Sequence, residues 1–340
     1  MFKQRISKSK GRAFALLAAM LLLAACGSGA GGGANGADGG MGSEGAAGGS
    51  GSGGADGNGP DGAIRVVTTI AQIAEPISVI GGGRVQVTSL MGPGVDPHLY
   101  QASQSDIRKL GSADIIFCNG LHLEANMLRA FEEIGKTRPV LAVGEAIAED
   151  RLLTDETGAV DPHVWFDIDL WKEALGAAVE ELKKLSPDDA EFFEANKRDY
   201  FAKMDELKEE AVRKMASVPE ERRVLVTAHD AFGYFGRMLG MEVVGLQGLS
   251  TEDEIGLSDI ERTIGLLVER RVPAVFVESS INPKSIEAVI EGAKERGLNV
   301  RLGGELFSDA MGGAGTGEGT YLGMFRHNVD TIYEALSGEE

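Results

Sequence analysis

The chain has 340 residues, among them 33 Lys and Arg against 52 Asp and Glu, which gives a formal net charge of -19 and a pI near 4.8. So acidic a surface repels a phosphate backbone, and nucleic acid is therefore excluded as an expected partner. The two cysteines cannot build a disulfide framework.

The first residues predict an exported lipoprotein. The opening MFKQRISKSKGR carries five positive charges and no acid, and the apolar run FALLAAMLLLAA follows it. That run is too short to span a bilayer comfortably and is typical of a secretory signal. The stretch LAAC resembles a lipoprotein cleavage box in which Cys26 becomes the lipidated N-terminus, and the alternative is an ordinary signal peptide with an incidental cysteine. We expect a signal peptide over 1–25.

Residues 26–62 are predicted to form a flexible tether behind the lipidated Cys26. After the cysteine this segment is nearly all Gly, Ala, Ser, Asn and Asp. Such a composition cannot bury enough apolar surface to offset the entropy of ordering, so disorder is expected. A flexible chain of this length has a root-mean-square span of about 30–36 Å. It would hold a globular body near a membrane partner.

Residues 63–185 are predicted to form an N-terminal α/β lobe. Short β-branched runs at 64–70, 85–91, 113–118 and 139–143 predict strands, and amphipathic patterns at 104–111 and 124–135 predict helices. Apolar strands that alternate with such helices indicate a parallel sheet covered on both faces. Cys118 lies within one apolar strand, where a lone cysteine is expected to be a buried packing residue.

Residues 186–219 predict one long connecting helix. Ser186 is a suitable N-cap, Pro187 suits the first helical position and Pro219 ends the pattern. The apolar residues recur at steps of three and four and form one stripe. They are Phe193, Phe201, Met204, Leu207, Ala211 and Met215. A helix of about 30 residues is about 45 Å long, enough to join two lobes.

Residues 220–340 repeat the strand and helix rhythm. Strands are predicted at 222–228, 242–246, 273–279 and 299–304, and helices at 257–271 and 283–297. The predicted fold is therefore α/β, with two lobes that each hold a roughly four-stranded parallel sheet flanked by helices, and with one long helix between them.

Four side chains are predicted to form a metal site. The motif VDPH occurs twice and ends in His98 and in His163. Its proline fixes its own φ and favours an extended residue before it, so each histidine follows a stiff turn. His98 and His229 follow strand ends, and Asp309 does the same further along. Ligands of open α/β sheets bind at those ends. Three imidazoles and a carboxylate complete a shell for a divalent transition metal.

The other two histidines of the chain are predicted to be structural or surface residues. His122 is placed at the start of a helix and His327 within the last helix. Glu278 at a strand end has two open readings, a general base for metal-bound water or a residue that holds a loop or a ligand.

The motifs VDPHLYQASQSD, NGLHLE, VDPHVWFD, TAHDAFGYF, GLQGLSTEDE, VFVESS and GGELFSDAMG resemble, in this order, the TroA-like (cluster A-I) metal-binding lipoproteins of bacterial ABC importers. The resemblance covers nearly everything after the tether. It implies metal held between two lobes by His98, His163, His229 and Asp309, and small closure movements about a rigid helix. It also implies delivery to an ABC permease and its ATPase by a monomer that is lipid-anchored outside the cytoplasm.

The resemblance also bears on which ion is carried. Zinc-uptake members often have a long His- and acid-rich loop between the first two ligands, and here that region has only His122. The motifs are nearer the manganese-binding lipoproteins, which favours Mn²⁺ as cargo, with Zn²⁺ close because three imidazoles bind zinc more tightly. Two other functions stay open, a surface adhesin or interaction lipoprotein and, last, a zinc-dependent hydrolase.

Overall fold

The N-terminal lobe is built on a four-stranded parallel sheet. The computed structural model describes residues 62–338, so the predicted signal peptide, Cys26 and all but the last residue of the predicted tether lie outside the described residues. The sheet has the order β2-β1-β3-β4. Its strands are β1 (Ile64–Thr68), β2 (Val85–Ser89), β3 (Ile115–Cys118) and β4 (Val140–Ala142). The central strands β1 and β3 are almost wholly buried, whereas the edge strand β2 is only partly buried at alternate residues, as the β-branched runs predict.

Helices flank this sheet and lead into its loops. They are α1 (Ala71–Gly81), α2 (Gln104–Ser112), α3 (Leu128–Gly135) and α4 (Ile168–Leu185). Neither α1 nor α4 is among the predicted elements. Proline inside a helix removes one hydrogen bond and predicts a break, yet α1 continues through Pro76 because Ile73, Ile77 and Ile80 are fully buried on one face.

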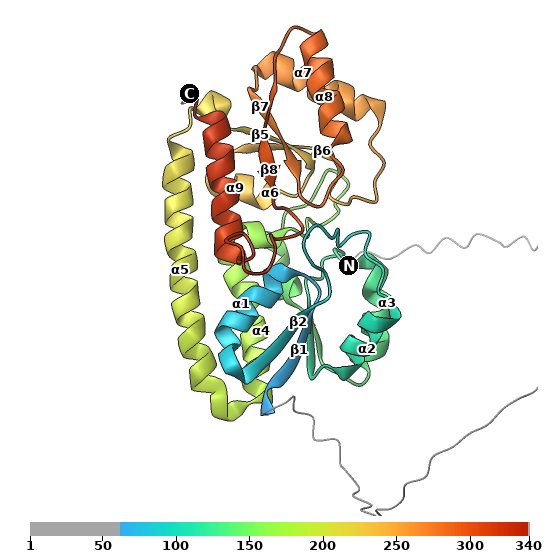
Figure 1. Ribbon diagram of the computed structural model, residues 1–340, viewed down its shortest axis with the longest axis vertical. Helices are drawn as coiled ribbons and strands as arrows, with labels where there is room; N and C mark the ends of the chain where they lie inside the picture. Colours follow the sequence, from blue (N-terminus) through green and yellow to red (C-terminus); the bar gives the residue numbers. More distant parts are fainter. Residues whose placement is uncertain (1–61, 339–340) are drawn as a thin grey trace, which may run out of the picture. The chain divides into compact units, whose positions relative to one another are not determined.

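The long helix α5 (Ala190–Ala216) is shorter than the range predicted for it. Pro187–Asp189 form a 3-10 turn, and the hydroxyl of Ser186 donates to the Asp189 carboxylate instead of capping a backbone N–H. The 27 residues of α5 span about 40 Å. Most of the predicted stripe is buried, and α5 packs along α1, α4 and α9 (Tyr321–Leu336) (Figure 1).

The C-terminal lobe repeats the arrangement of parallel strands and helices. Its strands are β5 (Val224–His229), β6 (Glu242–Gln247), β7 (Ala274–Glu278) and β8 (Arg301–Leu306), and its other helices are α6 (Gly233–Leu239), α7 (Leu257–Arg270) and α8 (Lys284–Glu295). The fold class is thus confirmed, with one difference. The four strands form two hydrogen-bonded pairs, β5–β6 and β7–β8, although β5 lies beside β7. At the end of β5 the N–H of His229 donates to the Glu278 side chain and not to a backbone carbonyl of β7.

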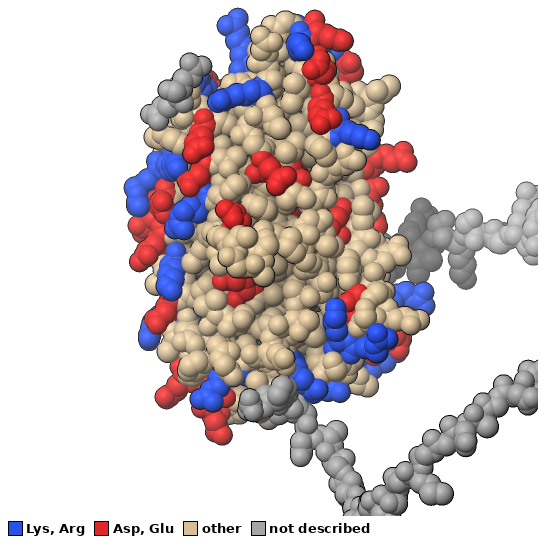
Figure 2. Space-filling view, in the orientation of Figure 1, with Lys and Arg blue, Asp and Glu red and all other residues tan. Residues whose placement is uncertain are grey.

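A continuous apolar core runs from the N-terminal sheet through α4 and α5 to α9, and a smaller one lies between β5, β7, α7 and α8. Cys118 is buried in the first of these, as predicted. On the face shown in Figure 2, basic and acidic side chains alternate along the side of α5. Several form ion pairs one helical turn apart, such as Lys197 with Glu194. No helix within residues 62–338 is long and apolar enough to cross a membrane.

Candidate metal centre

The two VDPH motifs fold in the same way. In each, the aspartate carboxylate accepts the backbone N–H of the histidine two residues later, Asp96 from His98 and Asp161 from His163, both at 2.9 Å. The proline between them fixes its own φ, so the turn is stiff and aims the imidazole in one direction. Repetition of the motif therefore places two histidines in equivalent local settings.

The four predicted site residues come from four separate segments. His98 lies in the loop between β2 and α2, His163 precedes a 3-10 turn at Val164–Phe166, His229 is the last residue of β5, and Asp309 follows β8. The backbone beside Asp309 is held by the N-terminal lobe. Gln72 of α1 donates its side-chain amide to the carbonyls of Ser308 and Asp309 at 3.2 and 2.9 Å, and the Trp165 indole donates to Ser308 at 3.2 Å.

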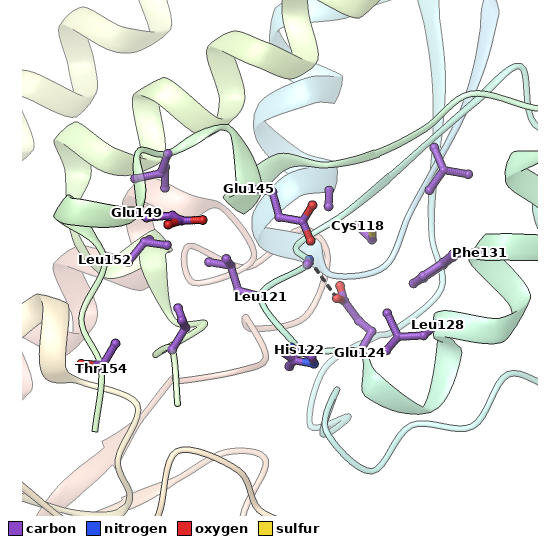
Figure 3. A pocket seen from close by; sticks show the side chains of 15 residues that line it. Cys118, Leu121, His122, Glu124, Leu128, Phe131, Glu145, Glu149, Leu152 and Thr154 are labelled. Carbon is purple, nitrogen blue, oxygen red and sulfur yellow. Dashed lines mark hydrogen bonds between the residues drawn. The ribbon is translucent and has the colours of Figure 1, made fainter. Parts of the chain in front are cut away.

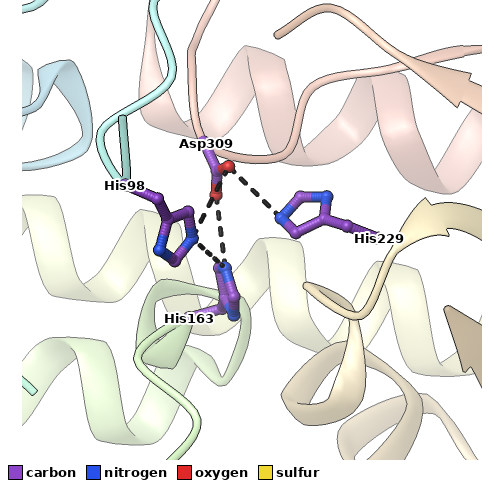
Figure 4. A group of neighbouring side chains, drawn as sticks. All are labelled: His98, His163, His229 and Asp309. Carbon is purple, nitrogen blue, oxygen red and sulfur yellow. Dashed lines mark hydrogen bonds and ion pairs between the residues drawn. The ribbon is translucent and has the colours of Figure 1, made fainter. Parts of the chain in front are cut away.

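The structure brings these four side chains into one buried cluster (Figure 4). One ligand atom of each lies within 4.8 Å of all the others. Nε2 of His98 is 3.4 Å from Nε2 of His163. The Asp309 carboxylate lies 3.3 Å from Nε2 of His163, 3.2 Å from Nε2 of His229 and 4.0 Å from Nε2 of His98. Each side chain is at most 4% exposed.

Carboxylates behind two of the imidazoles orient them. Nδ1 of His163 lies 2.7 Å from Asp161, and Nδ1 of His229 lies 2.5 Å from Glu278. A carboxylate on Nδ1 fixes the proton there and leaves Nε2 free to face the centre of the cluster. Glu278 also accepts the backbone N–H of its histidine, so it holds both the ring and the peptide of His229.

The electrostatics of the cluster separate His98 from the other two histidines. Burial lowers the pKa of His98 to about 4. Burial also acts to lower the pKa of His163, but the hydrogen bond with Asp161 and the nearby Asp309 carboxylate outweigh it and raise that pKa to about 9. In the same way, Glu278 and Asp309 overcome burial and raise the pKa of His229 well above 6.5.

The pKa of Asp309 lies well below its ordinary range, because the neighbouring His229 and His163 outweigh the opposing effect of burial. A buried carboxylate that stays ionised is a ligand ready for a cation.

The donor set fits a divalent transition metal. Both Asp309 oxygens and Nε2 of His229, which face the centre of the cluster, are buried without a hydrogen bond. Buried polar atoms are rarely left so, and several converging on one point indicate a site for an ion. Four nitrogen or oxygen ligands about 2.1 Å from a tetrahedral metal lie about 3.4 Å from one another. Three of the separations given above lie within about 0.2 Å of that spacing.

The other two histidines lie outside this cluster. His327 lies within α9, as predicted, and its ring contacts the carbonyl of Glu305. His122 was expected to start a helix, which is wrong. It is exposed in a turn with a left-handed φ of 67°, and α3 begins only at Leu128. The Glu124 carboxylate accepts the N–H groups of Asn119 and Gly120 and so holds the turn.

His122 instead lines a separate cavity of about 800 Å³, together with Cys118, Leu121, Glu124, Phe131 and Glu145 (Figure 3). The metal cluster contributes no side chain to this cavity.

Comparison with known proteins shows the family. Residues 66–335 match the model of the ZnuA family, the periplasmic component A of zinc-uptake complexes. The chain is 50% identical over 277 residues to the manganese-binding lipoprotein MntA of Bacillus subtilis, covering 81% of this chain and 90% of that protein. It is 49% identical over 277 residues to the zinc-binding protein TroA of Treponema pallidum, covering 82% and 90%.

The solved structure of periplasmic TroA from Treponema pallidum is similar as well, with a TM-score of 0.80 at 49% identity over 81% of this chain and all of that one. The chain therefore belongs to the ZnuA family of metal-uptake components.

Proposed function

We propose, from this membership of the ZnuA family, that the chain captures one divalent transition-metal ion and delivers it to an ABC permease. The observation that carries the proposal is the cluster itself. His98, His163, His229 and Asp309 aim one ligand atom each at a common point, and they come from both lobes. An ion bound there joins the lobes, so capture and closure are coupled.

The proposed cargo is Mn²⁺, with Zn²⁺ as a close competitor. Relatives at 50% and 49% identity are named for manganese and zinc respectively. Three imidazoles and one carboxylate bind zinc more tightly by the usual order of affinity, so uptake of manganese depends on geometry and on metal supply. Titration of the metal-free protein with each ion, followed by metal analysis of protein from cells grown with both, separates affinity from actual cargo.

Delivery requires a membrane partner, and relatives named as substrate-binding lipoproteins of manganese ABC transporters support one. We propose that the protein acts outside the cytoplasm as a monomer that is anchored by lipid at Cys26. The proposed division is a signal peptide over 1–25, a tether over 26–62, lobes over 63–185 and 220–340, and a connecting segment over 186–219. An acyl-anchored protein on a flexible tether stays close to its permease without a membrane-spanning segment.

The same geometry argues against a hydrolase. A catalytic zinc needs an open position for water and a general base beside it. Asp309 takes the fourth position, and the Glu278 carboxylate is engaged by the ring and the peptide of His229. We therefore propose binding and transfer of the ion without turnover.

Metal-induced stabilisation tests the proposed ligands. An ion at a hundredfold excess over its Kd stabilises the folded state by about 2.7 kcal/mol. Alanine at any one ligand should remove most of the rise in melting temperature that Mn(II) or Zn(II) causes. The four ligand variants are those of His98, His163, His229 and Asp309. His122→Ala and His327→Ala are matched controls that should keep the rise. A full rise in the Asp309→Ala variant would reject the proposed site.

A further inference from the structure

His98 is held differently from the other proposed ligands. The carboxylates behind His163 and His229 belong to the same lobe as their histidines, and the backbone of Asp309 is held by fully buried Gln72 and Trp165. By contrast, Nδ1 of His98 has no hydrogen-bond partner among residues 62–338. Its position therefore depends on what holds its backbone.

Both ends of the His98 peptide are held by side chains that also contact the other lobe. The Asp96 carboxylate accepts the N–H of His98 with one oxygen, and with the other it accepts the hydroxyl of Thr251 at 2.6 Å. The Asn126 side-chain amide donates to the carbonyl of His98 at 2.8 Å and to the carboxylate of Glu252 at 3.0 Å. Thr251 and Glu252 lie in the loop at 248–256, between β6 and α7 of the C-terminal lobe.

Hydrogen bonds within the β6–α7 loop support the residues that contact the N-terminal lobe. Gln247, the last residue of β6, donates its side-chain amide to the carbonyls of Thr251 and Asp253. Gly248 lies at the base of the loop, close to the Asp253 side chain, whose carboxylate would be 2.8 Å from a Cβ added there. The Gln247 amide thus supports the part of the loop that presents Thr251 and Glu252.

The two sides of the site differ in how readily they can open. The contacts that Gln72 and Trp165 make with Ser308 and Asp309 are wholly buried. The contacts of Thr251 and Glu252 with Asp96 and Asn126 are partly buried or exposed, so water can replace them at little cost. Separation of the lobes should begin on the side of His98.

We propose that Thr251, Glu252, Asp96 and Asn126 form a latch that holds His98 at the ion and sets the rate at which the ion leaves. This rests on the proposed function. While the latch is closed, His98 is held against the other three ligands. When the β6–α7 loop detaches, both contacts that fix the His98 peptide lose their support, and the ion keeps only the three ligands that are anchored independently. Thr251 and Glu252 are thus positioning residues for release.

The test is the rate of release of Zn(II) or Mn(II) from the metal-loaded full chain into excess chromogenic chelator, at chelator concentrations where the rate no longer rises. Thr251→Val and Glu252→Ala should each release the ion about three- to tenfold faster, the change expected from the loss of one partly exposed hydrogen bond. The association rate should stay within about twofold. Glu254→Ala is the matched control, because this exposed acid of the same loop makes no hydrogen bond or ion pair with the described residues of the other lobe. Glu252→Gln keeps the acceptor and should behave as the wild type.

Release rates of Thr251→Val and Glu252→Ala equal to that of Glu254→Ala would overturn the latch, with the proposed function intact as long as the wild type binds one ion per chain. A wild type that binds no ion would overturn both. Faster release in the Glu252→Gln variant as well would show that the charge of Glu252, and not its hydrogen bond to Asn126, controls release. That result would also overturn the proposed latch.

Discussion

Metal binding should release about two protons per ion at pH 7. The pKa of His163 is about 9 and that of His229 lies well above 6.5, so without metal both rings carry a proton on each nitrogen at pH 7. The pKa of His98 is about 4, so its ring is already neutral. A metal ion needs the free lone pair of Nε2 and must displace the proton there, whereas the Nδ1 protons stay with Asp161 and Glu278.

The sign and size of the pH effect follow from this count. As the pH rises there are fewer protons to displace, so binding tightens. While both protons are held, their displacement makes the Kd fall by up to about a hundredfold per pH unit. The slope should lessen as the pH approaches the pKa of His163, about 9. If both histidines had the pKa of free imidazole, near 6.5, the slope would already lessen near that lower pH.

Calorimetric titration at pH 7 in buffers of different ionisation enthalpy measures the proton count directly. Asp161→Asn removes the carboxylate that raises the pKa of His163, so the count should fall toward one at pH 8. His327→Ala changes a partly exposed histidine outside the cluster and should leave the number of released protons unchanged. A proton count near zero, or a Kd constant between pH 6 and 8, would refute the reasoning.

Three further predictions concern residues around the site and the anchor. Glu278→Gln removes the charge behind His229 and should weaken metal binding about 10- to 100-fold in equilibrium titration, and unchanged affinity would contradict its role. Gly245→Ala places a Cβ 2.5 Å from the backbone of Asp230, beside His229, so the melting temperature should fall by the equivalent of about 1–3 kcal/mol, and a wild-type melting curve would contradict this. Cys26→Ala should abolish labelling by radioactive fatty acid and release the protein from membranes, and persistent labelling would disprove the anchor.

Much of the candidate site could be predicted because its parts have local causes. Proline and aspartate before each of His98 and His163 dictate the local shape of a turn, while more distant contacts set where that turn lies in the fold. His229 and Asp309 follow apolar strands, and parallel strands end at a common edge where ligands meet. These two local rules were enough to place four residues from distant parts of the chain in one cluster.

The contacts that hold those four residues could not be predicted in the same way. Gln72 bonds to Asp309, 237 positions away, and Thr251 to Asp96, 155 away. The sequence around Gln72 or Thr251 contains no local pattern that would predict so distant a hydrogen-bond partner. Helix α1 was missed for a related reason, since the rule against proline in helices gives way to the burial of one apolar face.

The carboxylates around the site explain how one buried cluster can exist both with and without its ion. Asp161, Glu278 and Asp309 bring three negative charges to the three imidazoles. Without metal, the extra protons on His163 and His229 supply two positive charges, and a divalent ion that displaces them supplies the same two. Capture is then an exchange at constant net charge. Three negative and two positive charges leave the same net charge of -1 in both states, so capture adds no charge to the interior, where added charge is costly. A monovalent or trivalent ion in exchange for the same two protons would change the net charge of the cluster, whereas a divalent ion leaves it constant.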